Sequence, residues 1–137
     1  DPTIREWDTS TWKQVGDPWS GHTDSIYALA VNSTGTLITS VSSDANARLW
    51  QLSDQRATAI FKASNEMYRA TFSVDDRYIL CGGKDNNITE WAVPEYVVLE
   101  DSPREQASDV ISNPFLMPFV ISSRARILYQ CMLQRDR

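Results

Sequence analysis

The sequence is short of the residues that build metal sites, disulfide frameworks and membrane spans. It has only two cysteines and one histidine among its 137 residues. Cys81 and Cys131 lack the close spacing of zinc ligands. Because they lie 50 residues apart, we interpret them as free thiols of an intracellular protein and not as a disulfide. The longest apolar run, residues 115–121, is far shorter than the roughly 20 residues that a helix needs to cross a membrane. We therefore expect no metal, no cofactor, no membrane partner, and an intracellular, cytoplasmic location.

Positive charge is scarce as well. Lys and Arg number 13 against 18 Asp and Glu, and the formal net charge is −5. Nucleic-acid binding needs clustered cations, so we expect no nucleic-acid partner. Residues 82–85 (GGKD) lack the spacing and the following Ser or Thr of a phosphate-binding loop, and we interpret them as a strand turn. The sequence also shows no convergent acid, base and nucleophile, so we expect no enzymatic activity.

What the sequence does contain is a repeat. Trp7, Trp50 and Trp91 follow one another at intervals of 43 and 41 residues. An aspartate stands six positions before each of them: Asp1, Asp44 and Asp85. Residues 21–52 and 62–93 align without a gap, and their shared positions include Tyr27 and Tyr68. A period of this size indicates supersecondary units that bury a core only by stacking on one another.

Each unit reads as a set of short strands joined by tight turns. In the second unit we predict strands at residues 25–31, 37–41, 47–52 and 56–61. In the third unit we predict them at residues 66–73, 77–81 and 87–93, with 95–99 as a fourth. Connections this short make neighbouring strands antiparallel. Four-stranded antiparallel units at about 40-residue spacing are typical of β-propeller blades.

The chain resembles WD-repeat proteins. Gly21-His22 opens a unit, Trp7-Asp8 supplies the WD dipeptide, and Arg48-Leu49-Trp50 matches the usual ending of the third strand. The resemblance covers residues 1–93 and implies a hydrogen-bonded structural tetrad in each regular blade. By position the tetrad falls on four residues: His22, Ser40, Asp44 and Trp50. Such a network would satisfy a carboxylate that is withdrawn from water.

The third unit departs from this pattern. Ala63 and Cys81 stand where the second unit has His22 and Ser40. Asp85 and Trp91 are therefore the remainder of a degenerate tetrad, and we expect this unit to be looser. Asp76 also replaces Gly35 at a turn position that requires a positive φ, which aspartate tolerates less well than glycine.

We therefore expect an all-β chain that forms a partial β-propeller of about two and a half blades. The propeller fragment comprises a partial blade at 1–20, a repeat at 21–61 and a degenerate repeat at 62–99. The partial blade lacks its first two strands. A closed propeller has four or more blades, so we expect a fragment packed against the remaining blades of the same parent chain.

The tail, residues 100–137, is expected to be irregular. Its first ten residues are charged and rich in turn formers, which is typical of a linker. The spacing of the apolar residues further on predicts either a short helix at 123–135 or disorder. A WD ending followed by an acidic linker is similar to fungal WD-repeat proteins whose propeller precedes helical repeats.

The resemblance implies a non-enzymatic scaffold that binds protein or peptide partners. The family binds through loops before the first strand and between the second and third strands. By position these loops hold Thr23, Asp24, Ser25 and Ser43 in one repeat, and Ser64, Asn65, Glu66 and Lys84 in the next. Trp12 is either an exposed aromatic that serves as a further contact point or a side chain that a neighbouring blade partly buries. The alternative is a sensor module of a larger signalling NTPase, which a Walker motif elsewhere in the gene would indicate.

Overall fold

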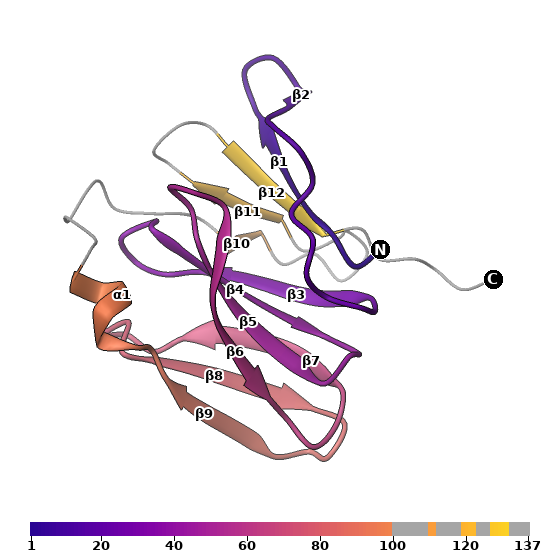
Figure 1. The fold of residues 1–137 in the computed structure, drawn as a ribbon, viewed down its shortest axis with the longest axis vertical. Coiled ribbons are helices and arrows are strands. Elements are labelled where there is room, and N and C mark those ends of the chain that lie inside the picture. The colour runs from indigo at the N-terminus through magenta and orange to yellow at the C-terminus, as the bar shows by residue number, and fades with distance from the viewer. Residues whose placement is uncertain (100–109, 112–118, 123–126, 132–137) are drawn as a thin grey trace.

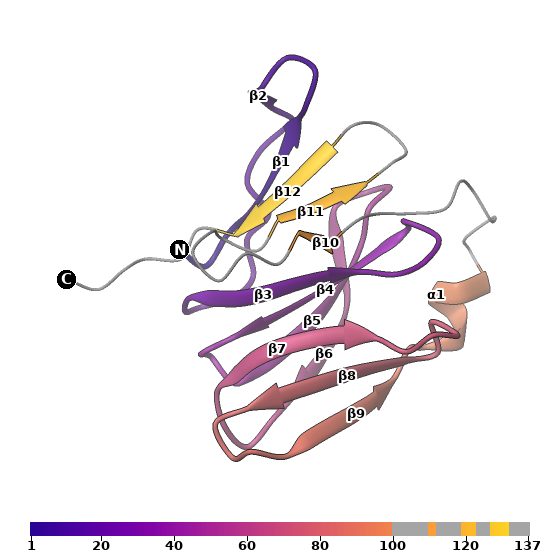
Figure 2. The ribbon, with the colours of Figure 1, turned by 180° about the vertical axis from the view of Figure 1, so that it is seen from behind.

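The computed structural model describes residues 1–99, 110–111, 119–122 and 127–131. Three antiparallel β-sheets, stacked face to face, make up most of the described chain (Figure 1). Seen from behind, β3 of the middle sheet lies between β11 of the first sheet and β7 of the third (Figure 2). The expected all-β fold, built from sheets of antiparallel strands, is therefore confirmed.

The middle sheet follows the predicted unit closely. Its strands are β3 (Ile26–Val31), β4 (Leu37–Ser42), β5 (Asn46–Gln51) and β6 (Arg56–Lys62), paired in sequence order. The turns between them place Gly35, Ala45 and Gln55 at positive φ angles of 68°, 61° and 60°. Every residue of β4 is buried, because this strand is central in its sheet and the sheet is covered on both faces.

The third sheet repeats this backbone with three strands. They are β7 (Met67–Phe72), β8 (Tyr78–Gly83) and β9 (Ile88–Ala92). Ile79 pairs with Trp91 as Ile38 pairs with Trp50. Asp76 and Asn86 take φ angles of 58° and 59°, at the positions of Gly35 and Ala45. The aspartate thus adopts the left-handed conformation that the repeat requires.

The prediction of a fourth strand at residues 95–99 was wrong, because these residues form helix α1 (Glu95–Leu99). Pro94 precedes the helix, and Glu95 places an acidic side chain in its first turn, where the helix dipole favours it. The helix buries Val97 in the core between the second and third sheets. Tyr96 donates its hydroxyl to the Thr58 carbonyl oxygen of β6 at 3.1 Å.

The first sheet combines both ends of the described chain. Its order is β10 (Val110–Ile111), β11 (Phe119–Ser122), β12 (Ile127–Cys131), β1 (Ile4–Asp8) and β2 (Lys13–Gln14). Trp7 pairs with Leu128 on β12, just as Trp50 pairs with Ile38 on β4. Strands β11 and β12 therefore occupy the two positions that the partial blade was expected to lack.

The helix expected at residues 123–135 was also wrong where the structure describes that segment, since residues 127–131 are strand β12. This strand contains isoleucine and tyrosine, which favour β-structure. It also pairs with the edge of β1, whose backbone groups would otherwise lack partners. Pairing with a distant strand thus overrides a weak local pattern. The linker expected at 100–109 lies outside the described residues.

Two apolar cores hold the three sheets together. The core between the first and second sheets contains Ile4, Trp19, Ile26, Leu29, Ile38 and Trp50. The core between the second and third contains Ala28, Leu37, Val41, Ala47, Leu49, Met67, Ile79, Cys81, Val93 and Val97. Trp19, which the sequence placed in or near a turn, lies in the first of these cores, with its ring 5.9 Å from that of Trp50.

Candidate partner-binding site

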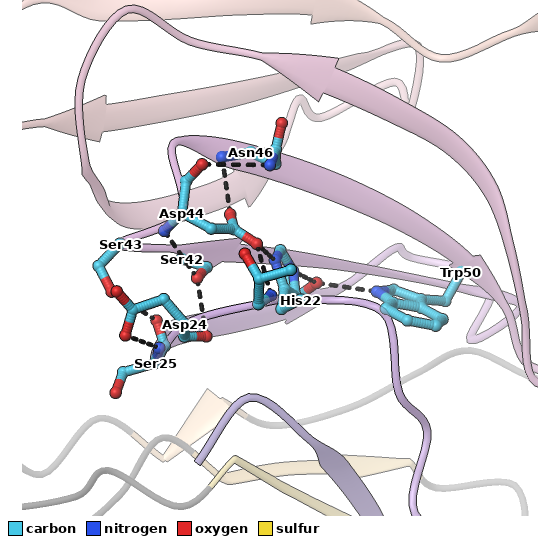
Figure 3. A network of polar contacts seen from close by, with 10 residues as sticks. His22, Asp24, Ser25, Ser42, Ser43, Asp44, Asn46 and Trp50 are labelled. Carbon is cyan, nitrogen blue, oxygen red and sulfur yellow. Dashed lines mark hydrogen bonds and ion pairs between the residues drawn. The ribbon is translucent and has the colours of Figure 1, made fainter.

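The structure brings the four tetrad residues of the second repeat into one hydrogen-bonded chain (Figure 3). His22 Nδ1 lies 2.8 Å from Asp44 Oδ2, and His22 Nε2 lies 2.7 Å from Ser40 Oγ. Trp50 Nε1 donates to Ser40 Oγ at 2.8 Å. These hydrogen bonds join the loop before β3 to buried side chains of β4 and β5.

The protonation state of His22 follows from its two neighbours. An ionised Asp44 can only accept, so Nδ1 of the imidazole carries the proton and Nε2 accepts from the Ser40 hydroxyl. Burial lowers the pKa of His22, although the hydrogen bond and charge of Asp44 oppose that change. Burial raises the pKa of Asp44, but hydrogen bonds from His22 and the Thr23 N–H outweigh it and hold that pKa below its ordinary value. The pair is therefore a neutral imidazole on a carboxylate.

The order Ser40, His22, Asp44 matches that of a hydrolase triad, so its accessibility needs to be examined. Ser40 is completely buried. Its oxygen already accepts the Trp50 N–H, and its hydroxyl is directed at His22. A nucleophile needs room for a substrate carbonyl beside it. This geometry supports a role in holding the backbone.

The network fixes the loops that carry the first set of candidate residues. Asp44 accepts from the Thr23 N–H at 3.1 Å and from the Asn46 N–H at 2.9 Å. The Ser42 hydroxyl donates to the Asp24 carbonyl oxygen at 3.0 Å. The Ser43 N–H donates to the Ser25 carbonyl oxygen, also at 3.0 Å. Thr23, Asp24, Ser25 and Ser43 consequently lie together at one end of the sheet.

The equivalent loops of the third repeat share the main-chain contact and lack the network. The Lys84 N–H donates to the Glu66 carbonyl oxygen at 3.0 Å, as Ser43 does to Ser25. Gly83 allows this approach, because a Cβ there would overlap with the same oxygen. Ser64 and Asn65 are exposed beside Glu66, and Asn65 Nδ2 donates to Ser64 Oγ at 3.4 Å.

The degenerate tetrad is open to solvent on one side. Among the residues that the structure describes, Asp85 is exposed and accepts a hydrogen bond only from the Asn87 N–H, at 3.1 Å. Cys81, at the position of Ser40, is buried, and burial raises the pKa of its thiol to about 12. Trp91 stacks on Phe61 with ring centroids 5.5 Å apart. The third sheet thus replaces a polar interior with apolar contacts.

Two residues at this edge were not among the predicted site residues. Tyr27 and Tyr68 lie just after the candidate loops, on β3 and β7, and their rings meet edge to face with centroids 5.2 Å apart. Tyr68 donates its hydroxyl to Glu66 Oε2 at 3.0 Å. Their identity at aligned positions was the sequence signal for them. Their contact joins β3 and β7 next to the candidate loops of the two repeats.

The part of the chain that the structure describes holds no group of three or more His, Cys, Asp or Glu side chains arranged to bind a metal ion. It also contains no helix with the length and apolar character needed to span a membrane.

Comparison with known families assigns the second repeat to a known repeat type. Residues 12–51 match the family described as WD domain, G-beta repeat. The match begins at Trp12, directly before β2, and runs through β3 and β4 to the end of β5, so it includes the whole tetrad. Residues 12–51 therefore form a repeat of the WD type, and the resemblance carried by the Trp-Asp and Gly-His dipeptides of the chain is confirmed.

Two curated proteins are similar to the chain over its repeats. Protein tipD of Dictyostelium discoideum is 32% identical over 74 residues, which are 53% of this chain and 12% of that protein. Eukaryotic translation initiation factor 3 subunit I of the fungus Mycosarcoma maydis is 29% identical over 80 residues, 58% of this chain and 23% of that protein. The chain therefore spans less than a quarter of the length of either relative.

Proposed function

We propose that the chain is a non-enzymatic scaffold that binds a protein or peptide partner through the loops at the start of β3 and β7. WD repeats are protein-interaction modules, which supports the general role. The observation that carries the proposal is the tetrad, because it fixes residues 23–25 against residues 42–44 from beneath. A loop held in this way loses little conformational freedom when it binds.

The exposed groups of these loops suit recognition of a peptide. Thr23, Asp24, Ser64, Asn65 and Lys84 are exposed, and they offer hydroxyl, carboxylate, amide and ammonium groups. Such groups can hydrogen-bond a partner's backbone and side chains. Rigid scaffolds with polar loops are a common arrangement for binding sites. The net charge of −5 offers no support for a nucleic-acid partner.

Further support comes from the tetrad itself and from one relative. The only histidine of the chain is engaged in the tetrad, and its serine neighbour is buried, so the proposal includes no catalytic role. The fungal relative is by name a subunit of an initiation factor, which fits a protein that works in an assembly. Cys81 is a free buried thiol, which fits an intracellular location.

A peptide-display selection against the 137-residue chain tests the proposal. The double variant Asp24→Ala, Ser43→Ala should weaken selected peptides by at least about tenfold, as for loss of two hydrogen bonds of about 1 kcal/mol each. The matched control is Thr71→Ala with Glu90→Ala, at exposed positions on the strands of the third sheet. Peptides that bind the loop variant and the wild type equally would overturn the proposed site.

A further inference from the structure

The tyrosine pair between the two repeats is built by a repeated irregularity of the backbone. The pairing of β3 with β4 shifts between Ile26 and Ala28, and that of β7 with β8 shifts between Met67 and Arg69. Tyr27 and Tyr68 are therefore the extra residues of two β-bulges at equivalent positions. A bulge redirects the side chain that it carries. The two rings consequently meet edge to face between neighbouring edge strands, at an interplanar angle of 78°.

Negatively charged side chains lie close to the tyrosine pair. Glu66 accepts the Tyr68 hydroxyl at 3.0 Å through Oε2, and among the described residues its Oε1 accepts no hydrogen bond. The nearby cations leave this carboxylate unneutralised. Arg69 donates to the Tyr68 carbonyl oxygen at 3.2 Å, and neither it nor Lys84 forms an ion pair with Glu66 within the described chain. Asp24 adds an exposed carboxylate on the adjoining loop.

Aromatic faces and a carboxylate that can accept another donor together recognise a cation. The face of a phenol ring attracts an ammonium or guanidinium group through its quadrupole. The Glu66 carboxylate lies beside one ring and can accept a charge-assisted hydrogen bond. An anionic side chain would be repelled by Glu66 and Asp24. An apolar side chain could contact the two rings but could not donate a hydrogen bond to the Glu66 carboxylate.

We propose that the Tyr27–Tyr68 pair and Glu66 form a subsite for a lysine or arginine side chain of the bound partner. The inference rests on the proposed function and deepens it, because it assigns the partner's chemistry: a basic peptide segment. The cation lies against the tyrosine rings and donates to Glu66. The loops on either side hold the peptide backbone.

The test titrates small probes into the full chain labelled with carbon-13 in its tyrosine rings. The probes are N-acetyl-lysine methylamide, its arginine analogue and the uncharged norleucine analogue. Tyr27→Phe and Tyr68→Phe assign the ring signals and retain cation binding. The cationic probes should shift both signals with a saturable curve and bind at least about threefold more tightly than norleucine, as expected for an exposed cation–π contact. Equal shifts with norleucine would overturn the proposal.

Variants separate the two parts of the subsite. Glu66→Gln should weaken the lysine probe about threefold and reduce its salt dependence, whereas Glu90→Gln should change neither. The double variant Tyr27→Leu, Tyr68→Leu lacks the labelled rings, so its binding is followed through the NMR signals of the lysine probe itself. It should show no saturable binding, with Tyr78→Leu as the matched control at another exposed tyrosine. Circular dichroism and tryptophan fluorescence check that each variant is folded. Saturable lysine binding to the folded leucine double variant would overturn the proposal.

A peptide from the display selection distinguishes this inference from the proposed function. If the loop variants lose the peptide but replacing its lysines and arginines by norleucine has no effect, the scaffold role stands and the cation subsite fails. If the loop variants keep the peptide, the proposed loop site fails, whatever the probes do at the tyrosines. If the peptide loses binding both to the loop variants and after replacement of its lysines and arginines, the result supports the loop site and the cation subsite.

Discussion

The second and third sheets share a backbone and differ in what fills it. Their strands keep the same register, and their turns place equivalent residues at positive φ. Yet Asp44 is part of a buried network, whereas the Asp85 side chain lies in solvent. The comparison shows that packing and turn geometry alone can maintain the blade backbone. The polar network is an addition that fixes particular loops.

The third sheet has its own attachments to the second. The Ser33 N–H donates to Asp76 Oδ2 at 3.0 Å, and the Ser33 hydroxyl donates to the same oxygen. Trp91 stacks on Phe61 of β6, and α1 reaches Thr58 on that strand through Tyr96. Aspartate at position 76 is less favourable than glycine at a positive φ, but its side chain makes a contact between the repeats that glycine could not make.

The largest effect should come from removing the tetrad carboxylate. Asp44→Ala should destabilise the chain by about 3 kcal/mol, because it leaves the buried Nδ1–H of His22 without its acceptor and also removes the acceptor of the Thr23 N–H. Asp85→Ala should cost less than about 0.5 kcal/mol, since that side chain is exposed. Urea unfolding followed by tryptophan fluorescence measures both. Equal losses would show that the network does not distinguish the two sheets.

Acid should weaken the second sheet through His22. The ordinary pKa of histidine is about 6.5, and burial lowers the pKa of His22 in the folded state. As the pH falls below the ordinary pKa of about 6.5, the unfolded chain binds a proton on His22 that the folded chain does not bind, so the free energy of unfolding decreases. The contribution is complete above about pH 6.5 and is lost as the pH falls toward the folded pKa.

Urea midpoints between pH 7.5 and pH 5 give this slope, and His22→Gln provides the control because the chain has one histidine. Burial raises the pKa of Glu6, so that group titrates in the opposite sense, and subtracting the variant's slope removes its contribution. A variant that retains the wild-type slope would contradict the assignment to His22.

The contact between Ser33 and Asp76 should contribute about 1 kcal/mol. Ser33→Ala should lose this amount, whereas Asp76→Ala should lose it together with the strain of alanine at a φ of 58°. The double variant should lose little more than Asp76→Ala alone, because the two residues share one interaction. Thermal unfolding of the four proteins measures the coupling. Additive losses would mean that the third sheet is attached by its apolar contacts alone.

The smallest effect concerns Trp12, which occupies the turn position that Gln55 has in the second repeat. Its φ is 56° and its side chain is 69% exposed. Trp12→Gly should stabilise the chain by up to about 1 kcal/mol, because glycine adopts this conformation without strain. Gln55→Gly should not, because Gln55 donates to the buried Glu6 at 2.9 Å. A stability loss in Trp12→Gly would indicate that the indole packs on the chain.

What the sequence could predict was set by local spacing. The turn residues and strand lengths gave the second sheet, and the family pattern named four residues that the structure brings together. Features that depend on distant contacts could not be predicted. Trp19 is buried because β1 and Trp50 lie against it, and β12 is a strand because β1 has a free edge. The Tyr27–Tyr68 contact required the relative placement of two sheets.

The pairing of β1 with β12 also has a consequence for synthesis on the ribosome. Ile4 pairs with Cys131, so the first sheet cannot be completed until nearly all of these residues have been translated. The second and third sheets depend on neighbours close in sequence and can assemble while the chain is still growing. Until β12 arrives, the edge of β1 is available to other nascent strands, and molecular chaperones would be expected to act during that interval.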